Sequence, residues 1–433
     1  YIILEPHNTI NMLISLAYVC LIASVSGQVS PPLSTGILPS LFVHGDHFSV
    51  GQQIGYTTRS SILYRLRRSE SVMQLVQWVS STPEGQAAYD AMLTTANNTF
   101  PEYVSELEGM AYGSGVNFET LFVLNVRNEL KTFKKASQHL RGDTIKEKPE
   151  VEHCSDYLMN ALSGSTADGV NEIVIGHNED GGWESRDESW LITAHMEGEG
   201  VRENIRYTSF VYAGELPTDA FFWNEHGVVG TMNGLYPVEC LYGGLGRNFI
   251  SRHLVGAVDI DDAISRVTIP NQATGHSFNF ASKHEQRLVN VEVAPGVHEK
   301  DKASLYVVTR IEQSLDVETA TSLFHANSYL FLDVEQDPSD SSAHRIARAA
   351  ELPPPQCVQD ILTVLGDTKD EEWPIYRTAT SEEESDSGYT LTTALFSIVF
   401  ENEKYSEKSS LTLYMSNPKT DQHVRLDKKL FVE

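Results

Sequence analysis

Two runs of mixed apolar and polar residues lie near the middle of the chain, with a polar segment between them. The first runs from Ser155 to Met159, and the second, which is rich in β-branched residues, from Glu172 to Gly176. The segment between them, residues 163–169, holds the glycine, serine and aspartate that are typical of turns. The pattern therefore predicts an antiparallel β-hairpin.

The position of the turn indicates which residues lie at the open end of this hairpin. If the turn is centred at Ala167, Cys154 and Asp180 are equally distant from the centre. Such residues face each other across an antiparallel pair, with Cβ atoms roughly 5 Å apart. A thiol opposite a carboxylate is a candidate catalytic pair. Spacing alone also allows a small buried cysteine beside an aspartate that belongs to a turn.

The chain before the hairpin has mainly helical periodicity. We expect helices within residues 60–67, 72–79, 101–112 and 118–129, the third opened by Pro101 and the last capped by Asn117. Residues 131–150 are rich in lysine and arginine and poor in apolar residues. They predict a solvated linker just before Cys154, where the chain could be cut without disturbing a core.

The chain after Asp180 is rich in strands. Strand patterns occur at residues 190–195, 207–212, 221–223, 227–232, 277–281, 288–293, 305–308, 390–400 and 410–414, and helical ones at 247–258, 260–267 and 342–350. Residues 367–388 are acidic and indicate a loop. Helical stretches separated by many strands favour helices packed on stacked sheets.

Composition and charge narrow the classes of partner. The chain has 433 residues, of which 41% are hydrophobic and 21% charged, as in ordinary globular proteins. Its 59 acidic and 32 basic residues give a net charge of −27. Phosphate backbones and anionic membrane surfaces would repel such a chain, so we expect no nucleic-acid partner.

The cysteine and histidine patterns do not indicate a metal site or a disulfide framework. The four cysteines are Cys20, Cys154, Cys240 and Cys357, and none forms a C-x-x-C pair. Because Cys20 lies in a candidate leader, an odd number remains and at least one thiol should be free. The histidines are scattered without the spacing of metal ligands. We expect no metal.

The N-terminal segment resembles a secretory signal. Residues 12–25 are mostly apolar, a length that suits a signal-peptide core, and cleavage would follow Gly27, with residues 1–11 as an upstream extension. A short membrane anchor or a buried strand remains the alternative, because no lysine or arginine precedes the apolar run. The prediction is a signal peptide over residues 1–27, no stable membrane span, and location outside the cell or in the endomembrane lumen. Secretion would make Asn97, in Asn-Asn-Thr, a glycosylation site; without a signal the protein would be cytoplasmic.

Several short stretches, in this order along the chain, resemble the motifs of one enzyme family. They are Pro101–Gly115, Leu124–Glu129, Cys154–Ser155, Gly176–Asp180, Asn224–Asn233, Ser277–Asn279, His344–Arg345 and Tyr414–Pro418. Together they resemble the acyl-coenzyme A:6-aminopenicillanate acyltransferase-like family of N-terminal-nucleophile (Ntn) hydrolases, over roughly residues 48–425. The order of the motifs makes the resemblance specific for the family and much less so for a substrate.

The resemblance implies an α+β fold, a four-layer αββα sandwich, made as an inactive precursor. Such precursors cut themselves before a cysteine, here between His153 and Cys154. The products would be an N-terminal chain of residues 28–153 and a chain of residues 154–433, held as a heterodimer within one Ntn-hydrolase domain. Many relatives have glycine where this chain has His153, which could slow the cleavage or assist it.

The cut would place a thiol and an α-amino group on the same residue. Their reference pKa values are about 8.5 and 7.7–8.0, so the amine can take the thiol proton directly or through water. Thiolate attack on an amide gives an oxyanion and then a thioester, which water or an amine resolves. The oxyanion needs preorganised donors, and the loss of one typically costs about 10²–10³ in rate.

The resemblance assigns roles to five residues of this sequence. Cys154 is the nucleophile, Asp180 holds its amine, and Arg345 lies near it with a charge that favours thiolate. Asn233 is the oxyanion donor, and Asn279 contacts the amine or the oxyanion. Without the resemblance, each asparagine would be interpreted as a turn or capping residue and Arg345 as part of a solvated helix face.

These assignments predict a self-processing cysteine hydrolase of small N-acyl amines. The resemblance allows a β-alanyl or other aminoacyl conjugate of an aromatic amine as substrate. One alternative is an acyl-CoA-dependent N-acyltransferase, with acyl-CoA as co-substrate. The alternative from another class is a catalytically silent binding protein with the same fold. No cofactor is expected for either enzyme.

Overall fold

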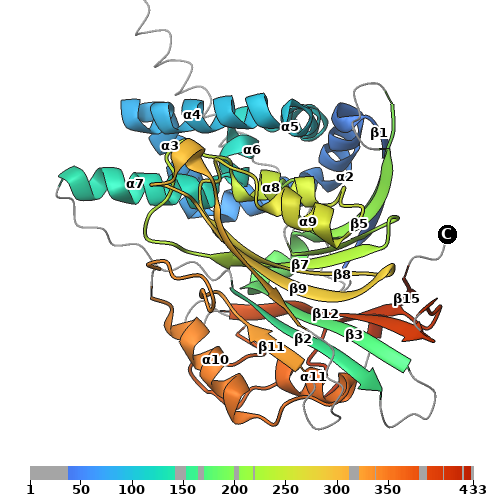
Figure 1. Ribbon diagram of the computed structural model, residues 1–433. Helices are drawn as coiled ribbons and strands as arrows, with labels where there is room; N and C mark the ends of the chain where they lie inside the picture. The colour runs from blue at the N-terminus through green and yellow to red at the C-terminus, as the bar shows by residue number, and fades with distance from the viewer. Residues whose placement is uncertain are drawn as a thin grey trace, which may run out of the picture.

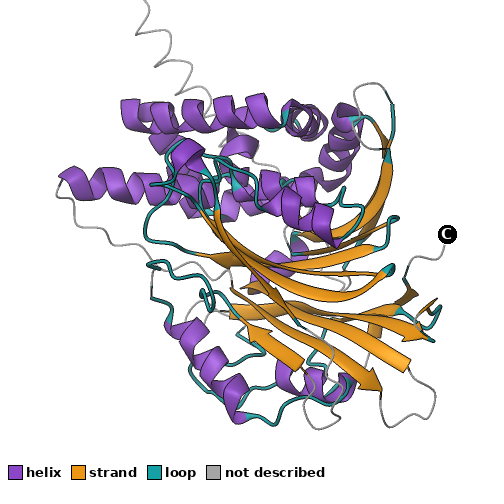
Figure 2. Cartoon of the chain, viewed as in Figure 1, coloured by secondary structure: helices purple, strands orange, loops and turns teal. Residues whose placement is uncertain are grey.

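The computed structural model describes residues 38–141, 153–163, 170–198, 204–217, 220–311, 321–336, 338–379, 388–402, 404–421 and 424–430. Two β-sheets stack face to face, and helices cover the outer face of each (Figures 1 and 2). This arrangement confirms the predicted four-layer αββα sandwich. The candidate signal peptide lies outside the described residues. Among the described residues, no helix combines the length and apolar character needed to cross a membrane.

The first helical layer is large and is built mostly from the N-terminal part of the chain. Its helices are α2 (His47–Arg68), α3 (Glu70–Ser81), α4 (Pro83–Thr99), α5 (Pro101–Ser114), α6 (Phe118–Asn125), α7 (Arg127–Arg141), α8 (Arg247–Leu254) and α9 (Ile260–Val267). The predicted start of α5 at Pro101 is confirmed, and Gly115 ends it in the left-handed conformation, with φ 68°. Asn97, the candidate glycosylation residue, is exposed in the last turn of α4.

Two predictions for this layer are wrong in detail. The helix expected over residues 118–129 is broken at Val126, whose φ of −124° ends α6. The expected linker is helical in its first half, because α7 continues to Arg141. Leu130 and Phe133 are buried on one face of α7, so a basic helix is anchored by a few apolar residues. Residues 142–150 lie outside the described part of the chain.

The upper sheet in Figure 1 packs under this layer. Its order is β1-β4-β5-β6-β7-β8-β9-β10, and β1 alone pairs in parallel, with β4. The strands are β1 (Ser40–Gly45), β4 (Ser189–Met196), β5 (Ile205–Tyr212), β6 (Phe221–Asn224), β7 (Val228–Leu235), β8 (Gly275–Ser282), β9 (Glu285–Ala294) and β10 (Leu305–Arg310). Aliphatic and aromatic side chains from both the helices and this sheet form one buried cluster.

The second sheet holds the predicted hairpin. Its order is β11-β2-β3-β12-β14-β15, with β13 paired to β12. The strands are β2 (His153–Ser163), β3 (Val170–Gly182), β11 (Thr321–His325), β12 (Gly388–Glu401), β13 (Lys404–Tyr405), β14 (Ser410–Tyr414) and β15 (Val424–Lys429). A second apolar cluster, which includes Ile175, Phe221 and Phe396, lies between the two sheets. Helices α10 (Asp340–Glu351) and α11 (Val358–Leu365) pack on the outer face of this sheet.

Candidate active site

The β2–β3 hairpin places Cys154 near the start of β2, next to the first sheet. Cys154 pairs with Glu179, and Asp180 pairs with His153. The predicted pairing of Cys154 with Asp180 is therefore wrong by one residue. A shift of one residue moves a side chain to the opposite face of a strand. Glu179, which sequence reasoning did not single out, thus shares the face of the thiol.

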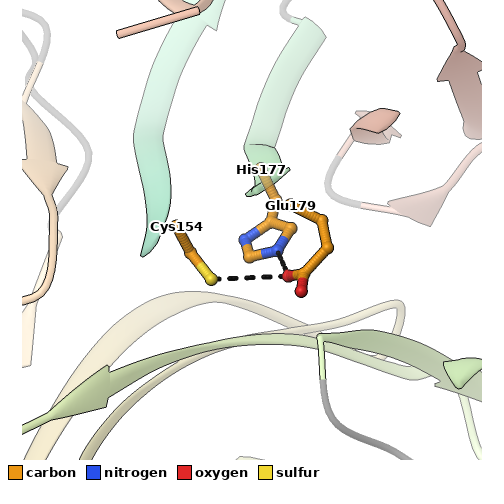
Figure 3. A group of neighbouring side chains, drawn as sticks. All are labelled: Cys154, His177 and Glu179. Carbon is orange, nitrogen blue, oxygen red and sulfur yellow. Dashed lines mark hydrogen bonds and ion pairs between the residues drawn. The ribbon is translucent and has the colours of Figure 1, made fainter. Parts of the chain in front are cut away.

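The Cys154 thiol contacts a carboxylate that also binds an imidazole. Its Sγ lies 3.4 Å from Glu179 Oε2, and His177 Nε2 lies 3.0 Å from the same oxygen. Figure 3 shows both side chains pointing toward this carboxylate. Tyr212 donates its hydroxyl to the other oxygen, Oε1, at 2.5 Å. Burial, and then the negative charge of Glu179, raise the pKa of the Cys154 thiol, so the sulfur keeps its proton near neutral pH.

His177 lies between two carboxylates that keep its ring protonated. Burial lowers the pKa of His177, but Asp156 and Glu179 outweigh it and raise the pKa to about 10. Near neutral pH the ring is therefore an imidazolium, which faces Asp156 with Nδ1 and Glu179 with Nε2.

A chain of buried hydrogen bonds extends from His177 into the first sheet. His177 Nδ1 lies 3.0 Å from Asp156 Oδ1, which accepts the Thr231 hydroxyl at 2.6 Å. Asn279 Nδ2 donates to Thr231 Oγ1 at 3.0 Å, and Asn279 Oδ1 accepts from Asn290 at 2.9 Å. Among the described residues, Asn279 is therefore connected to the thiol through other side chains; its assigned contact with the amine or the oxyanion stays a prediction.

Arg345 is fully buried and is hydrogen-bonded to the backbone of Cys154. Its Nη1 donates to the Cys154 carbonyl oxygen at 2.5 Å and to Ser155 Oγ at 2.9 Å. Its Nη2 donates to Asn327 Oδ1 at 2.9 Å, and that oxygen also accepts the Cys154 backbone N–H at 3.0 Å. The alternative interpretation, in which Arg345 lies on a solvated helix face, is wrong, because α10 directs this side chain toward β2. Asn327 is a residue that sequence reasoning missed.

Asp180 lies beside Cys154 but on a different face, against β12 and Arg377. Thr390 donates to its Oδ1 at 2.6 Å, and Arg377 Nε lies 3.6 Å from its Oδ2. Burial raises the pKa of Asp180 to about 7, although the charges of Arg377 and Arg345 oppose the rise. Its charge is close enough to raise the pKa of Cys154 as well.

Asn233 is fully buried on β7, and neither polar atom of its side chain has a hydrogen-bond partner among the described residues. Its neighbour Gly234 is linked to Cys154 through Asn327, which donates to the Gly234 carbonyl at 3.1 Å and accepts the Cys154 backbone N–H. An unpaired buried amide costs free energy and is uncommon. Its unpaired N–H group is a donor of the kind that an oxyanion requires; the assigned role of Asn233 stays a prediction.

A model of the family "Acyl-coenzyme A:6-aminopenicillanic acid acyl-transferase" matches residues 166–410, more than half of the chain. The chain belongs to this family. The resemblance seen in the sequence motifs is thereby confirmed.

One curated relative and two solved structures are also similar to this chain. The beta-alanyl-dopamine/carcinine hydrolase of Drosophila melanogaster is 26% identical over 416 residues, which cover 93% of this chain and 98% of the relative. The two structures are a mutant and a variant of the conjugated bile acid hydrolase of Clostridium perfringens, 12% and 13% identical. Each match covers 64% of this chain and 96% or 97% of the hydrolase, with TM-scores of 0.34 and 0.32.

In this family member, sequence reasoning missed Glu179, which contacts the thiol, and His177, which binds the same carboxylate oxygen. His177 and Glu179 both lie in the Gly176–Asp180 motif and alternate along β3, so they share one face. That alternation was the available signal, but it identifies the inward face only when the register is known. The cysteine count predicted at least one free thiol, and Cys154, Cys240 and Cys357 are all free.

Proposed function

We propose that this protein is a self-processing cysteine Ntn hydrolase that cleaves the amide bond of a small N-acyl amine. The observation that carries the proposal is the environment of Cys154. Its thiol, backbone N–H and carbonyl each have a buried side-chain partner, in Glu179, Asn327 and Arg345 respectively. A structural cysteine needs none of these contacts, whereas a nucleophile must be held in one orientation.

The first step is maturation between His153 and Cys154. Glu179 accepts the thiol proton, and the sulfur attacks the carbonyl carbon of His153. The C–N bond breaks, the nitrogen takes a proton to become the α-amine of Cys154, and His153 is left as a thioester on the sulfur. Water then hydrolyses the thioester, giving the carboxylate of His153 and the free thiol. The products are chains of residues 28–153 and 154–433.

The second step repeats this chemistry on the substrate. The α-amine of Cys154 takes the thiol proton, and the thiolate attacks the amide carbonyl. Asn233 donates to the oxyanion, the amine product leaves with a proton, and water resolves the acyl thioester to an acid. In this scheme Arg345 and Asn327 fix the backbone of Cys154, and Asp180 holds the new ammonium group.

The relative named for beta-alanyl-dopamine and carcinine indicates the substrate class. We propose that the acyl group is β-alanyl or another aminoacyl group and that the leaving group is an aromatic or heteroaromatic amine. We also propose a secreted or endomembrane-lumen protein, processed from a precursor with a signal over residues 1–27 and glycosylated at Asn97, whose exposure is compatible with modification. No nucleic-acid partner is proposed for a chain of net charge −27.

The test is hydrolysis of N-β-alanyl amines by the purified, matured protein, with and without an added acyl-CoA. We expect acid and amine products without acyl-CoA, and none from a Cys154→Ala variant. Product that requires acyl-CoA would replace this proposal with the N-acyltransferase alternative, the activity after which the family is named. Tight binding of substrate without any product would identify a silent binding protein.

A further inference from the structure

One sulfur, one nitrogen and one oxygen atom, from Cys154, His177 and Glu179, lie close together. Cys154 Sγ lies 3.4 Å from Glu179 Oε2, His177 Nε2 lies 3.0 Å from that oxygen, and all three atoms lie within 4.8 Å of one another. Zinc binds such atoms at about 2.0–2.3 Å, which in a tetrahedron sets them roughly 3.3–3.6 Å apart. The sulfur–oxygen distance falls within this range, and the nitrogen–oxygen distance lies just below it.

The two side chains on β3 are already oriented as metal ligands would be. His177 turns its second nitrogen, Nδ1, to Asp156, 3.0 and 3.1 Å from the two carboxylate oxygens. Tyr212 holds the second oxygen of Glu179 at 2.5 Å. In zinc sites, a ligating histidine usually donates its other ring N–H to a carboxylate, and a ligating carboxylate usually accepts a hydrogen bond.

The donor set also determines which ion fits. Thiolate and imidazole favour zinc or another late transition ion, whereas calcium and magnesium require several oxygen donors. Cys154, His177 and Glu179 supply one sulfur, one nitrogen and one oxygen, and all three residues are buried. Three protein ligands leave a fourth position of a tetrahedral ion open to water.

We infer that Cys154, His177 and Glu179 form a Zn²⁺-binding site that reversibly inhibits the enzyme by holding the nucleophile as a zinc thiolate. Binding forms the Zn–S, Zn–N and Zn–O bonds. It releases the thiol proton and the Nε2 proton of the imidazolium to solvent, with no change in oxidation state. The inhibitory part rests on the proposed function, because a sulfur bound to zinc cannot attack a carbonyl.

The test uses Co²⁺ as a spectroscopic probe on the full chain, with zinc as competitor. Cobalt bound to a thiolate gives a sulfur-to-metal charge-transfer band in the near ultraviolet. We expect one Co²⁺ per chain, the band in the wild type, its displacement by Zn²⁺, and its absence in Cys154→Ser. Asp156→Asn should weaken binding roughly 10–100-fold, the usual effect of losing an outer contact.

The matched control is Cys357→Ser. Cys357 is an exposed free thiol whose Sγ also lies 3.4 Å from a carboxylate, that of Asp360, so it reproduces one contact of the site at another place. The band should persist in this variant. A band that survives Cys154→Ser, a band lost in Cys357→Ser, or no binding by a folded wild type would overturn the site.

The rates of maturation and amide hydrolysis distinguish a failure of this inference from a failure of the proposed function. We expect Zn²⁺ to stop both maturation and amide hydrolysis, and a chelator to restore them. A cobalt band together with rates that ignore Zn²⁺ would overturn the inhibitory role. Metal-free protein that neither matures nor hydrolyses amides would contradict the proposed function, while the cobalt band would still decide the site because it needs no turnover.

Discussion

Asn233 combines complete burial with a side-chain amide that has no hydrogen-bond partner among the described residues. An unsatisfied buried donor costs about 1–3 kcal/mol, so the native structure keeps it at the expense of stability. In the proposed mechanism the oxyanion is its partner. This residue was assigned from the family motif alone, because no spacing rule distinguishes an oxyanion donor from a turn asparagine.

Asn233→Ala should therefore lower kcat about 10²–10³-fold and change KM little, because the lost hydrogen bond forms in the transition state. Its effect on the free energy of unfolding should be small or stabilising. Steady-state kinetics on the matured chain and denaturant unfolding measure the two quantities. Asn248→Ala is the matched control: it is also buried, but its Nδ2 is bonded to Glu215, so it should cost stability. An Asn233→Ala variant with wild-type kcat would remove this residue from the mechanism.

At the scale of elements, the hydrophobic pattern predicted most of the strands and the hairpin, because alternation and turn residues are local signals. The register of β2 on β3 was not predictable to one residue. Pairing Cys154 with Glu179 instead of Asp180 moves the centre of the turn by only half a residue. The short strands β1 and β11 lie at sheet edges. They are strands because they pair with segments that are distant in the sequence, which a local pattern does not show. The role of Arg345 was predictable only from the family motif, because tertiary packing determines whether an arginine on a helix is buried.

The α2–α5 crossing is very close and gives a prediction about stability. A Cβ added at Gly51 would lie 1.8 Å from the carbonyl oxygen of Glu106 in α5, where backbone cannot move aside. Gly51→Ala should therefore destabilise the protein by about 1–3 kcal/mol or more, despite the better helix propensity of alanine. Thr57→Ala, at an exposed position of the same helix, is the control and should be nearly neutral. Equal unfolding free energies for Gly51→Ala and wild type would contradict the close packing of α2 against α5 at Gly51.

An ion pair between α10 and the loop after α11 gives a pH prediction. Burial raises the pKa of Asp367, but hydrogen bonds, first that from Arg348, outweigh it and lower the pKa from 3.8 to about 2. A lowered carboxyl pKa stabilises the fold above about pH 4, and this stabilisation is lost as pH falls toward 2. Asp367→Asn should cost roughly 1.5–3 kcal/mol at pH 7 and flatten the loss of stability below pH 4. Unfolding free energies across this pH range check it; parallel curves for the two proteins would contradict it.

At the scale of the whole molecule, the proposed cut separates segments that share one core. Residues of α2–α7, which precede Cys154, pack with residues of β4–β9, which follow it, in a single buried cluster. Strand β1 also pairs with β4 along its whole length. The cut itself breaks one peptide bond next to residues 142–152 and removes none of these contacts.

The matured chains should therefore stay together under native conditions and separate only in denaturant. Size-exclusion chromatography with native mass spectrometry would show one species whose mass is the sum of the two chains. The uncut Cys154→Ala chain, run beside it, gives the elution volume of an intact molecule. Separate elution of the fragments in native buffer would contradict a core shared across the cut.

The most direct test of the central claim is the intact mass of the purified protein, wild type beside Cys154→Ala, under denaturing conditions. The proposed mechanism predicts two chains in the wild type, the larger beginning at Cys154, and a single uncut chain in the variant. A single uncut chain in both samples after long incubation would contradict self-processing and leave the fold as that of a binding protein.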